Sequence, residues 1–427
     1  MVATEMPDTQ AVREAVHQQY ESLPYPVRDP EDELDRLLQP TMCELPRVNA
    51  MLWGGRRAPD GTFRVLDAGC GTGDATVFMA EQLRDTGARV TALDLSAASL
   101  DITRRRLEKR GLTGTVDLVQ ASIEDAPSLD LGEFDFISTS GVLHHLPSPE
   151  AGLRVLRDLL KPDGGIAVMV YAQSGREPVY LMQSLLRMVA PSEFGEERRL
   201  RILKRALQAL PAENRGVRGL LDTPLFRSEI TRSDAGAYDL LLHSQDRAYT
   251  VPQIYDWLDG TDLRLLDWAV PRVYRPQSYW PGAEVAHLNG ADLAAAAELM
   301  NGRMEKHHFF AARAEASPAP QPAPDDLHAV PVWTAWRFDT ALGQALAQPG
   351  NQLKFDLGED RGIILNGDAL NRRLLGAVDG HRSVGAILDE VSGVLTTQTP
   401  EQIRRRWMEL CDAMREIAAL VLYAPAA

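Results

Sequence analysis

A short apolar strand that runs straight into three alternating glycines constrains this chain more than any other feature. The segment is Val65-Leu-Asp-Ala-Gly-Cys-Gly-Thr-Gly73, and the next predicted strand, Arg89–Asp94, ends on a carboxylate. Glycine lets the backbone approach a ligand closely and adopt φ values that other residues avoid. A carboxylate at the tip of the neighbouring strand can accept hydrogen bonds from both hydroxyls of a ribose. The two segments together predict a nucleoside cofactor.

The spacing of the glycines narrows the choice of cofactor. A dinucleotide fingerprint reads G-x-G-x-x-G and places a pyrophosphate on a helix N-terminus. Here Gly69, Gly71 and Gly73 alternate directly behind Asp67. An acidic strand end is a poor neighbour for a pyrophosphate but a good one for a cationic amino-acid group. S-adenosylmethionine carries such a group, so the pattern favours this cofactor over a dinucleotide.

Strand and helix patterns alternate from about residue 60 to residue 172. After Asp94 the sequence predicts a helix from Ser96 to Arg110 and then, in order, the strands Val116–Gln120 and Phe134–Ser138, the helix Pro149–Leu160, a break at Lys161–Gly165 and the buried strand Ile166–Val170. This alternation predicts an α/β fold whose parallel sheet is covered on both faces. Ligands of such sheets bind outside the carboxyl ends of the strands.

Within this region the sequence resembles the class I S-adenosylmethionine-dependent methyltransferases, which have a Rossmann-like sheet. The resemblance is carried by the D-x-G-x-G-x-G run, by Leu143-His-His-Leu-Pro147 and by Leu160-Lys-Pro-Asp-Gly-Gly165. It implies that Asp67 lies near the methionyl ammonium, that Asp94 binds the ribose and that Leu95 packs on the adenine. It further places Ser122 and Ile123 at the adenine edge, where many relatives carry aspartate at the Ser122 position, and Thr139, Ser140 and Gly141 beside the methionine part.

An amphipathic helix at the start of the chain is a candidate lid. Its apolar positions, Val12, Val16 and Tyr20, precede the Pro-rich turn Pro24–Val27. Tyr20 and Tyr25 either pack within this helical segment or cover the cofactor, and the neighbouring prolines favour the cover.

Catalytic residues are harder to assign because a sulfonium methyl group is already a strong electrophile. The enzyme mainly has to align the nucleophile and exclude water, and it needs a base only for an acceptor that is protonated at neutral pH. His145 is a candidate, with His144 expected in the core. His243, Asp246 and Tyr249 belong to a dense polar cluster that fits a solvated loop and an acceptor site equally well.

The adjacent histidines are not expected to bind a metal. Neighbouring residues on one backbone point in different directions, and no cysteine or carboxylate cluster at ligand spacing accompanies them. His307-His308, on a predicted closing strand, is expected to be structural.

Composition limits the partners and the compartment. The net charge of −15 argues against a nucleic-acid backbone as the main partner. Three cysteines far apart in the sequence favour a reducing compartment, and no apolar run is long enough to cross a bilayer. We therefore expect a cytoplasmic protein that binds neither nucleic acid nor membrane.

The length of 427 residues predicts more than one domain. We expect an N-terminal helical lid over residues 1–60 and a methyltransferase domain over 61–314, with a helical insertion at about 173–250. Residues 315–331 are rich in proline and alanine and predict an extended linker, and residues 332–427 form a small α+β domain.

The expected C-terminal domain begins with a hairpin, Lys354–Leu357 and Ile363–Leu365 around the turn Gly358–Gly362, followed by helices that begin near Asp368, Ser383 and Pro400. The last helix carries an apolar seam of six residues, Ile403, Trp407, Leu410, Met414, Ile417 and Val421. The seam fits a coiled coil, and so a homodimer, but packing inside the domain is favoured.

This layout resembles winged-helix modules, including the peptide-recognition domains of peptide-modifying enzymes and the regulatory domains of some bacterial protein methyltransferases. The resemblance implies a protein or peptide substrate. The alternatives are a small-molecule methyltransferase of secondary metabolism whose last domain dimerises, and a non-catalytic cofactor-binding regulator.

Overall fold

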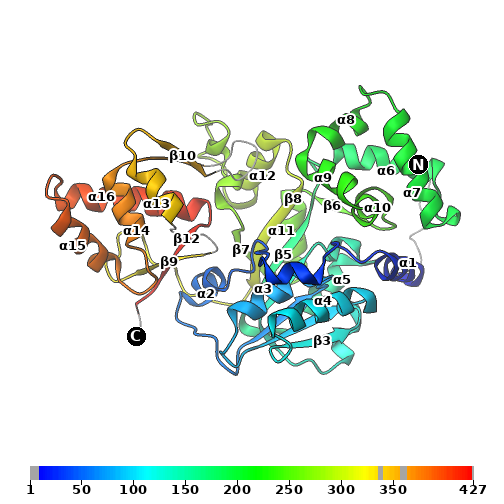
Figure 1. Ribbon diagram of the computed structural model, residues 1–427, viewed down its shortest axis with the longest axis horizontal. Coiled ribbons are helices and arrows are strands. Elements are labelled where there is room, and N and C mark those ends of the chain that lie inside the picture. Colours follow the sequence, from blue (N-terminus) through cyan, green and yellow to red (C-terminus); the bar gives the residue numbers. More distant parts are fainter. Residues whose placement is uncertain (1–8, 335–339, 356–362, 426–427) are drawn as a thin grey trace.

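The computed structural model describes residues 9–334, 340–355 and 363–425. Its centre is one mixed sheet, drawn as arrows in the lower middle of Figure 1. In chain order its strands are β1 (Arg64–Ala68), β2 (Arg89–Asp94), β3 (Val116–Gln120), β4 (Phe134–Ser140), β5 (Leu160–Ala172), β6 (Ala248–Tyr249), β7 (Leu263–Trp268) and β8 (Lys306–Arg313). In space they follow the order β3-β2-β1-β4-β5-β8-β7, with the short β6 beside β5.

The first five strands are parallel, and β8 pairs antiparallel with both β5 and β7. Successive residues of one strand point to opposite faces, so Val65 and Phe136 enter one core while Leu66 and Ile137 enter the other. Both faces are therefore buried, as the alternating pattern of strands and helices predicts. The Rossmann-like α/β fold is confirmed.

Helices cover both faces of the sheet. Those that belong to this layer are α2 (Leu45–Trp53), α3 (Asp74–Gln82), α4 (Ala97–Arg110), α5 (Pro149–Asp158), α11 (Val251–Asp259) and α12 (Gly290–Asn301). Sequence signals set their ends: the hydroxyl of Ser96 accepts the N–H of Ser99 and so caps α4, and Gly111 ends this helix in a left-handed conformation.

The expected break at Lys161–Gly165 is wrong. These residues are the irregular first part of β5, because Phe134 pairs with Leu160 while Phe136 already pairs with Gly165. The extra residues on β5 are absorbed as a shift of register between these two pairs, so β4 and β5 remain neighbours on both sides of it.

Two helical segments lie at the carboxyl ends of the parallel strands. The first holds α1 (Thr9–Ser22) and the short 3-10 helix η1 (Pro30–Leu34). The second is inserted between β5 and β6 and consists of α6 (Glu177–Val189), α7 (Glu196–Ala209), α8 (Arg215–Asp222), α9 (Pro224–Arg232) and α10 (Asp234–Leu242). Figure 1 shows this insertion in green at the upper right, with α1 below it and above α4. The insertion has a hydrophobic core of its own.

The C-terminal region contains β9 (Val330–Trp333), α13 (Thr340–Ala347), β10 (Gln352–Phe355), β11 (Ile363–Asn366), α14 (Ala369–Gly376), α15 (Val384–Val394), α16 (Pro400–Glu416) and β12 (Leu420–Tyr423). The hairpin is confirmed, since β10 pairs antiparallel with β11, but its turn Gly358–Gly362 lies outside the described residues. The strands β9 and β12 form a second antiparallel pair. The winged-helix assignment stays a prediction.

The apolar seam of the last helix packs inside this region. Trp407 and Met414 are fully buried in the region's own core, which supports packing within the domain over a coiled coil. The expected extension of the helix to Val421 is wrong. The helix α16 ends at Glu416, Ala418 has a φ of 58°, and Val421 lies in β12, where it pairs with Val332.

The proline-rich segment before β9 lies against the protein on both sides. The N–H of Ala319 donates to the carbonyl of Leu52 at 3.2 Å, and the indole N–H of Trp407 donates to the carbonyl of Pro324 at 2.9 Å. The end of the chain contacts α2 as well, since the hydroxyl of Tyr423 donates to the carbonyl of Pro46. The C-terminal region is thus held against α2, as Figure 1 shows at the left.

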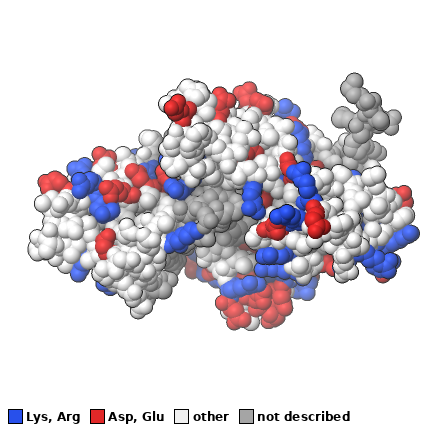
Figure 2. Space-filling view, turned by 90° about the horizontal axis from the view of Figure 1, so that it is seen from above, with Lys and Arg blue, Asp and Glu red and all other residues white. Residues whose placement is uncertain are grey.

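Charged side chains of both signs are interspersed over the face shown in Figure 2. Among the described residues, several ion pairs join residues of one helix, such as Arg105 with Asp101 on α4. Within the same part of the chain, no helix combines the length and the apolar character needed to cross a membrane.

Candidate active site

A cavity of about 850 Å³ opens at the carboxyl ends of the parallel strands. Asp67 from β1, Asp94 from β2 and Ser140 from β4 line one side, and residues of α1, α9 and α10 line the other. This is the edge at which ligands bind to open α/β sheets. The volume lies in the range of ordinary small-molecule sites, about 300–1,000 Å³.

The loop of residues 69–73, which we call the glycine loop, forms the floor of this cavity. Gly69 and Gly71 line it, and both have a positive φ. A Cβ on Gly71 would lie 2.8 Å from the carbonyl oxygen of Tyr25, so only glycine lets the N-terminal segment cross the loop here. Gly73 does not line the cavity. It precedes α3 and packs against Thr103 of α4.

Asp94 is held by the loop that it faces. One of its carboxylate oxygens accepts the N–H of Gly71 at 2.7 Å, and the other accepts the N–H of Ser96 at 2.9 Å. Burial raises the pKa of Asp94, although these backbone N–H groups act against the shift. Each carboxylate oxygen keeps a further lone pair for a ligand hydroxyl. Leu95, Ser122 and Ile123 line the same end of the cavity, where the resemblance implies an adenine.

Asp67 is a buried carboxylate that accepts a hydrogen bond from one side chain. It is 3% exposed, and the hydroxyl of Thr76 donates to it at 2.6 Å. Burial raises the pKa of Asp67 to about 7; the Thr76 hydrogen bond opposes the shift, and the charge of Asp94 adds to it. Among the described residues, no basic side chain forms an ion pair with Asp67. A ligand ammonium in the cavity would favour its ionised form, so the site fits the amino-acid part of S-adenosylmethionine.

The expected methionine-side residues follow at the end of β4. Ser140 and Gly141 line the cavity, whereas Thr139 is buried inside the strand and does not.

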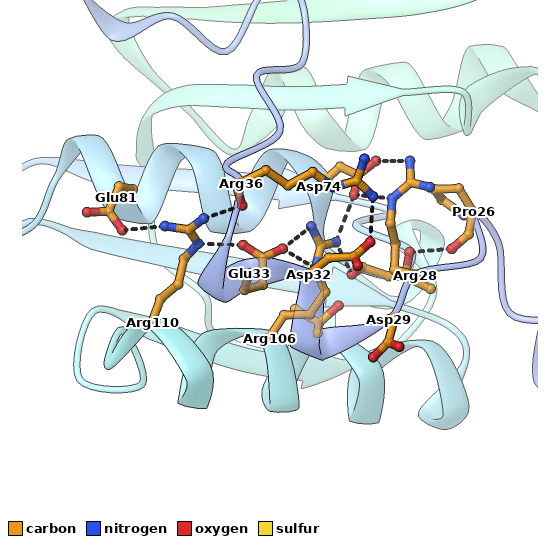
Figure 3. Close-up of polar contacts among 12 residues, drawn as sticks. Pro26, Arg28, Asp29, Asp32, Glu33, Arg36, Asp74, Glu81, Arg106 and Arg110 are labelled. Atoms are coloured by element: carbon orange, nitrogen blue, oxygen red, sulfur yellow. Dashed lines mark hydrogen bonds and ion pairs between the residues drawn. The ribbon is translucent and has the colours of Figure 1, made fainter.

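Residues 25–40, which we call the strap, run from α1 to α2 across the glycine loop. Figure 3 shows how charged side chains fasten it. Arg28 forms two hydrogen bonds with Asp74, at 2.8 and 2.6 Å. The fully buried Arg106 of α4 reaches Asp74 at 2.7 Å, Glu33 of the strap at 2.8 Å and the carbonyl of Thr72 at 2.7 Å. The strap is therefore bound to the loop that forms the floor of the cavity.

The wall opposite the glycine loop, which we call the acceptor wall, consists of side chains from separate elements. Five chemically active members are Tyr20, His145, Glu229, Asp239 and Lys306. The hydroxyl of Tyr20 donates to the carboxylate of Asp239 at 2.8 Å and lies 3.2 Å from Nε2 of His243. Tyr20 thus lines the cavity, as the lid assignment implies, and also fixes a carboxylate of the acceptor wall. Sequence reasoning did not foresee this second role.

The backbone of one residue, Gln245, contacts both histidines. The N–H of Gln245 lies 3.0 Å from Nδ1 of His243, and its carbonyl oxygen lies 2.7 Å from Nδ1 of His145. From these hydrogen bonds we assign a proton to Nδ1 of His145, and we assign to His243 the neutral tautomer with its proton on Nε2. The two rings stack with centroids 3.8 Å apart.

Of the four catalytic candidates, His145 lines the cavity and the other three do not. His145 lines the cavity and His144 is fully buried, which matches the expected division between them. His243 lies behind His145 and Tyr20, and burial lowers its pKa well below the ordinary value.

The structure does not bring Asp246 or Tyr249 to the cavity, and the expectation that they line an acceptor site needs correction. Asp246 is occupied by hydrogen bonds from Arg176 at 3.0 Å and Tyr180 at 2.7 Å. Tyr249 is buried and stacks on Trp257, with centroids 5.0 Å apart.

His145, Asp239 and His243 bring possible metal-ligand atoms within 4.8 Å of one another. The carboxylate that the sequence lacked near the histidines comes from α10, far along the chain. A metal on Nε2 of His243 would need the proton on Nδ1, where it would face the N–H of Gln245. The hydrogen bonds therefore favour a polar network over a metal site.

Glu229, Asp239 and Lys306 gave no signal in the sequence. The first two lie on α9 and α10 of the insertion, and Lys306 is the first residue of β8. The neighbouring His307 is structural, as expected, since it is buried between the hydroxyl of Tyr274 at 2.9 Å and the carbonyl of Tyr249 at 3.0 Å.

Comparison with known proteins identifies the region that holds the glycine loop. Residues 65–164 match a family described as a methyltransferase domain. An uncharacterized protein of Synechococcus is 30% identical over 338 residues, which is 77% of this chain and 78% of that protein. A ubiquinone biosynthesis O-methyltransferase of Thiobacillus denitrificans is 35% identical, but the match spans only 27% of this chain and 47% of that enzyme.

Among solved structures, PKMT2 from Rickettsia typhi in complex with AdoHcy has a similar fold. It aligns with 89% of this chain and 75% of its own, with a TM-score of 0.61 and 15% identity. The alignment thus extends beyond the sheet, and the low identity limits it to a likeness of fold.

Proposed function

The chain belongs to the class I S-adenosylmethionine-dependent methyltransferases, and we propose that it transfers the methyl group to a basic side chain of a protein or peptide. When bound, S-adenosylmethionine supplies an electrophilic methyl group on a sulfonium. Asp67 and Asp94 would hold its ammonium and its ribose. The protein then has to position an acceptor in line with the sulfur–methyl bond and exclude water.

The acceptor wall carries this proposal. Two carboxylates, Asp239 and Glu229, line it together with the rings of Tyr20 and Tyr25. Carboxylates and aromatic faces are the groups that hold a cationic amine. Burial raises the pKa of Asp239, and an entering cation would favour its ionised form. The arrangement suits a protonated amine better than a neutral hydroxyl.

A cationic acceptor has to lose a proton before it can attack. The reference pKa of a lysine ammonium is about 10.4, so little free amine is present at neutral pH. His145 lines the cavity, and with its Nδ1 bonded to the carbonyl of Gln245 the neutral ring can accept a proton only on Nε2. His145 is therefore our candidate for the general base. His243 and the peptide of Gln245 hold this ring and the Tyr20–Asp239 pair in position.

The comparisons support the protein acceptor only through architecture. The O-methyltransferase relative matches this chain over the cofactor-binding part, so its substrate does not bear on the acceptor wall. The likeness to PKMT2 includes the regions outside that part. The C-terminal region is held against α2, so it would offer a bound polypeptide a second surface in a fixed position outside the cavity.

The test is transfer of a radiolabelled methyl group from S-adenosylmethionine in the presence of the full-length chain and cell lysate. Large and small labelled products are separated, and labelled protein is hydrolysed to identify the methylated amino acid. We expect label in a basic side chain of a lysate protein, and no such label with an Asp94→Asn variant.

The same experiment recognises the two competing functions. Label confined to small molecules would favour a small-molecule methyltransferase, the class to which the O-methyltransferase relatives belong. Tight cofactor binding without transfer to any acceptor would favour a regulator. Removal of residues 331–427 is a poor test, because it would uncover the face of α2 that Tyr423 and the proline-rich segment cover.

A further inference from the structure

One lysine of this chain lies in the cavity itself. Lys306 is the first residue of β8 and pairs with Tyr171 of β5, so it stands at the strand edge where the cofactor-binding loops end. It lines the same cavity as Asp67, Met169 and Gly141. The amine therefore shares one space with the residues expected to surround the methionine part of the cofactor.

The surroundings of Lys306 differ from those of the other lysines. Lys109 and Lys204 each form an ion pair with an exposed carboxylate, and Lys161 forms one with the buried carboxylate of Asp135. Among the described residues, Lys306 forms no ion pair of that kind. Burial lowers the pKa of Lys306 and Arg176 adds to this, while Glu229, Glu305 and Asp239 act in the opposite direction. A cationic cofactor in the same cavity would lower this pKa further.

We assign the binding of an external amine to the acceptor wall, and this wall already contains an amine of the chain itself. Lys306 lines the cavity together with Glu229, Asp239 and His145. A nucleophile, its proton acceptors and the expected methyl donor site all face one cavity. No second protein is needed to bring these groups together.

We propose that Lys306 is a methyl acceptor and that this chain modifies its own acceptor wall. Lys306 first gives one proton to Nε2 of His145 or to the carboxylate of Asp239. Its Nζ lone pair then forms the new nitrogen–carbon bond while the sulfur–carbon bond of the sulfonium breaks and its electron pair stays on sulfur. The products are a secondary ammonium on Lys306 and S-adenosylhomocysteine, and the base passes its proton to solvent.

The modification would change how the wall receives other acceptors. A methylated ammonium keeps its charge, gains apolar volume and loses one hydrogen-bond donor. It would narrow the space beside Glu229 without removing the positive charge. The proposal rests on the methyltransferase chemistry of the family and not on an external protein substrate, so it can hold even if that substrate proves to be a small molecule.

The test uses the purified full-length chain, labelled S-adenosylmethionine and no other acceptor. Peptide mass mapping should find one added methyl group on Lys306, formed at a rate per chain that does not change on dilution. Lys306→Arg should remove this mark, whereas Lys204→Arg, a matched change on the exposed face of α7, should keep it. Asp94→Asn should also lose the mark, which separates enzymatic transfer from direct chemical methylation.

A second readout needs no cofactor. The pH dependence of reaction with an amine-reactive reagent should show Lys306 titrating below 10.5, the ordinary value of a lysine. Calorimetry with S-adenosylhomocysteine shows whether each variant is folded and binds. Binding without a mark, a mark on another lysine, a mark that persists in Asp94→Asn, or ordinary titration of Lys306 would overturn the proposal. A chain that does not bind the cofactor at all would overturn the proposal and the family's chemistry together.

Discussion

The two sides of the cavity are built in different ways. The cofactor side takes Asp67, Asp94 and Ser140 from the ends of three neighbouring strands and Gly71 from the loop after β1, and their positions follow from the order of the strands. The acceptor wall takes its side chains from α1, the turn after β4, the insertion and β8. The first side depends on local backbone geometry, whereas the second exists only after distant segments have packed together.

This difference predicts different consequences of mutation. Carboxylates and N–H groups of the cofactor side should govern affinity for the cofactor. Side chains of the acceptor wall should govern the rate of transfer and leave cofactor affinity nearly unchanged. Variants that failed to separate in this way would show that the two sides do not have separate tasks.

The largest effect is expected on the acceptor wall, for His145→Gln. This change keeps a polar side chain but removes the proton acceptor, and a general base contributes about 100-fold to 10,000-fold. Label transfer to a protein acceptor should fall by about 100-fold or more, while calorimetry shows unchanged affinity for S-adenosylhomocysteine. His287→Gln, on an exposed loop, should behave as the unmodified chain. Equal loss in both variants would contradict the base.

On the cofactor side, Asp94→Asn should have the next largest effect. It removes hydrogen bonds from a charged acceptor, each worth about 1.5 kcal/mol or more, so affinity should fall by about 100-fold. The control is Asp117→Asn on the neighbouring β3, where the native Asp117 forms an ion pair with Arg89 at the surface. If calorimetry found the same cofactor affinity for both variants, Asp94 would not be a cofactor-binding residue.

Asp67→Asn should weaken cofactor affinity by about tenfold, because the cofactor's ammonium loses one partner. The same change should stabilise the protein in the absence of ligand. The folded pKa of Asp67 is about 7, above the ordinary value of 3.8, so ionisation above pH 7 costs folding free energy. This cost disappears as the pH falls through 7 toward the ordinary value. At pH 8 the asparagine variant should gain up to about 4 kcal/mol in the free energy of unfolding.

The control for this variant is Asp256→Asn, at an exposed position of α11. Urea unfolding at pH 8 and pH 5 should show the gain of Asp67→Asn shrinking as the pH falls. In the unmodified chain, cofactor affinity should fall between pH 8 and pH 6 as Asp67 takes up a proton. A gain in stability that does not depend on pH would refute the assignment.

The smallest effect is expected for the strap. Arg28→Met breaks the paired hydrogen bonds to Asp74, which are partly exposed, and should accelerate cofactor release by about threefold to tenfold through loss of ~1 kcal/mol. Arg36→Met, which breaks an exposed pair with Asp32 in the same segment, is the matched control. Stopped-flow release rates measure both variants. Identical rates would show that the strap does not hold the cofactor in place.

The sequence predicts the cofactor side well because its signals are local. Alternating glycines behind Asp67 and a carboxylate at the end of the next strand need only the parallel order of β1 and β2 to meet in one cavity. For the strap the sequence predicted the turn Pro24–Val27 and the role of Tyr25 but not the pairing of Arg28 with Asp74, which joins segments that no periodic pattern relates.

The acceptor wall shows the limit of such prediction. The sequence pointed to Asp246, which lies in the polar cluster with His243, and gave no signal for Asp239. Packing decides between them: Arg176 and Tyr180 hold Asp246 inside the insertion, while Tyr20 holds Asp239 at the cavity. The polar character of this region could be read from the sequence, but the direction of each side chain depends on how α1 meets α10.

A crystal structure of the full-length chain with S-adenosylhomocysteine tests most directly whether both sides serve one reaction. The account predicts ribose hydroxyls on the carboxylate of Asp94, the ammonium near Asp67, and the sulfur directed toward His145 and Lys306. A ligand whose sulfur points away from the acceptor wall, or one that leaves Asp67 or Asp94 without contact, would contradict it.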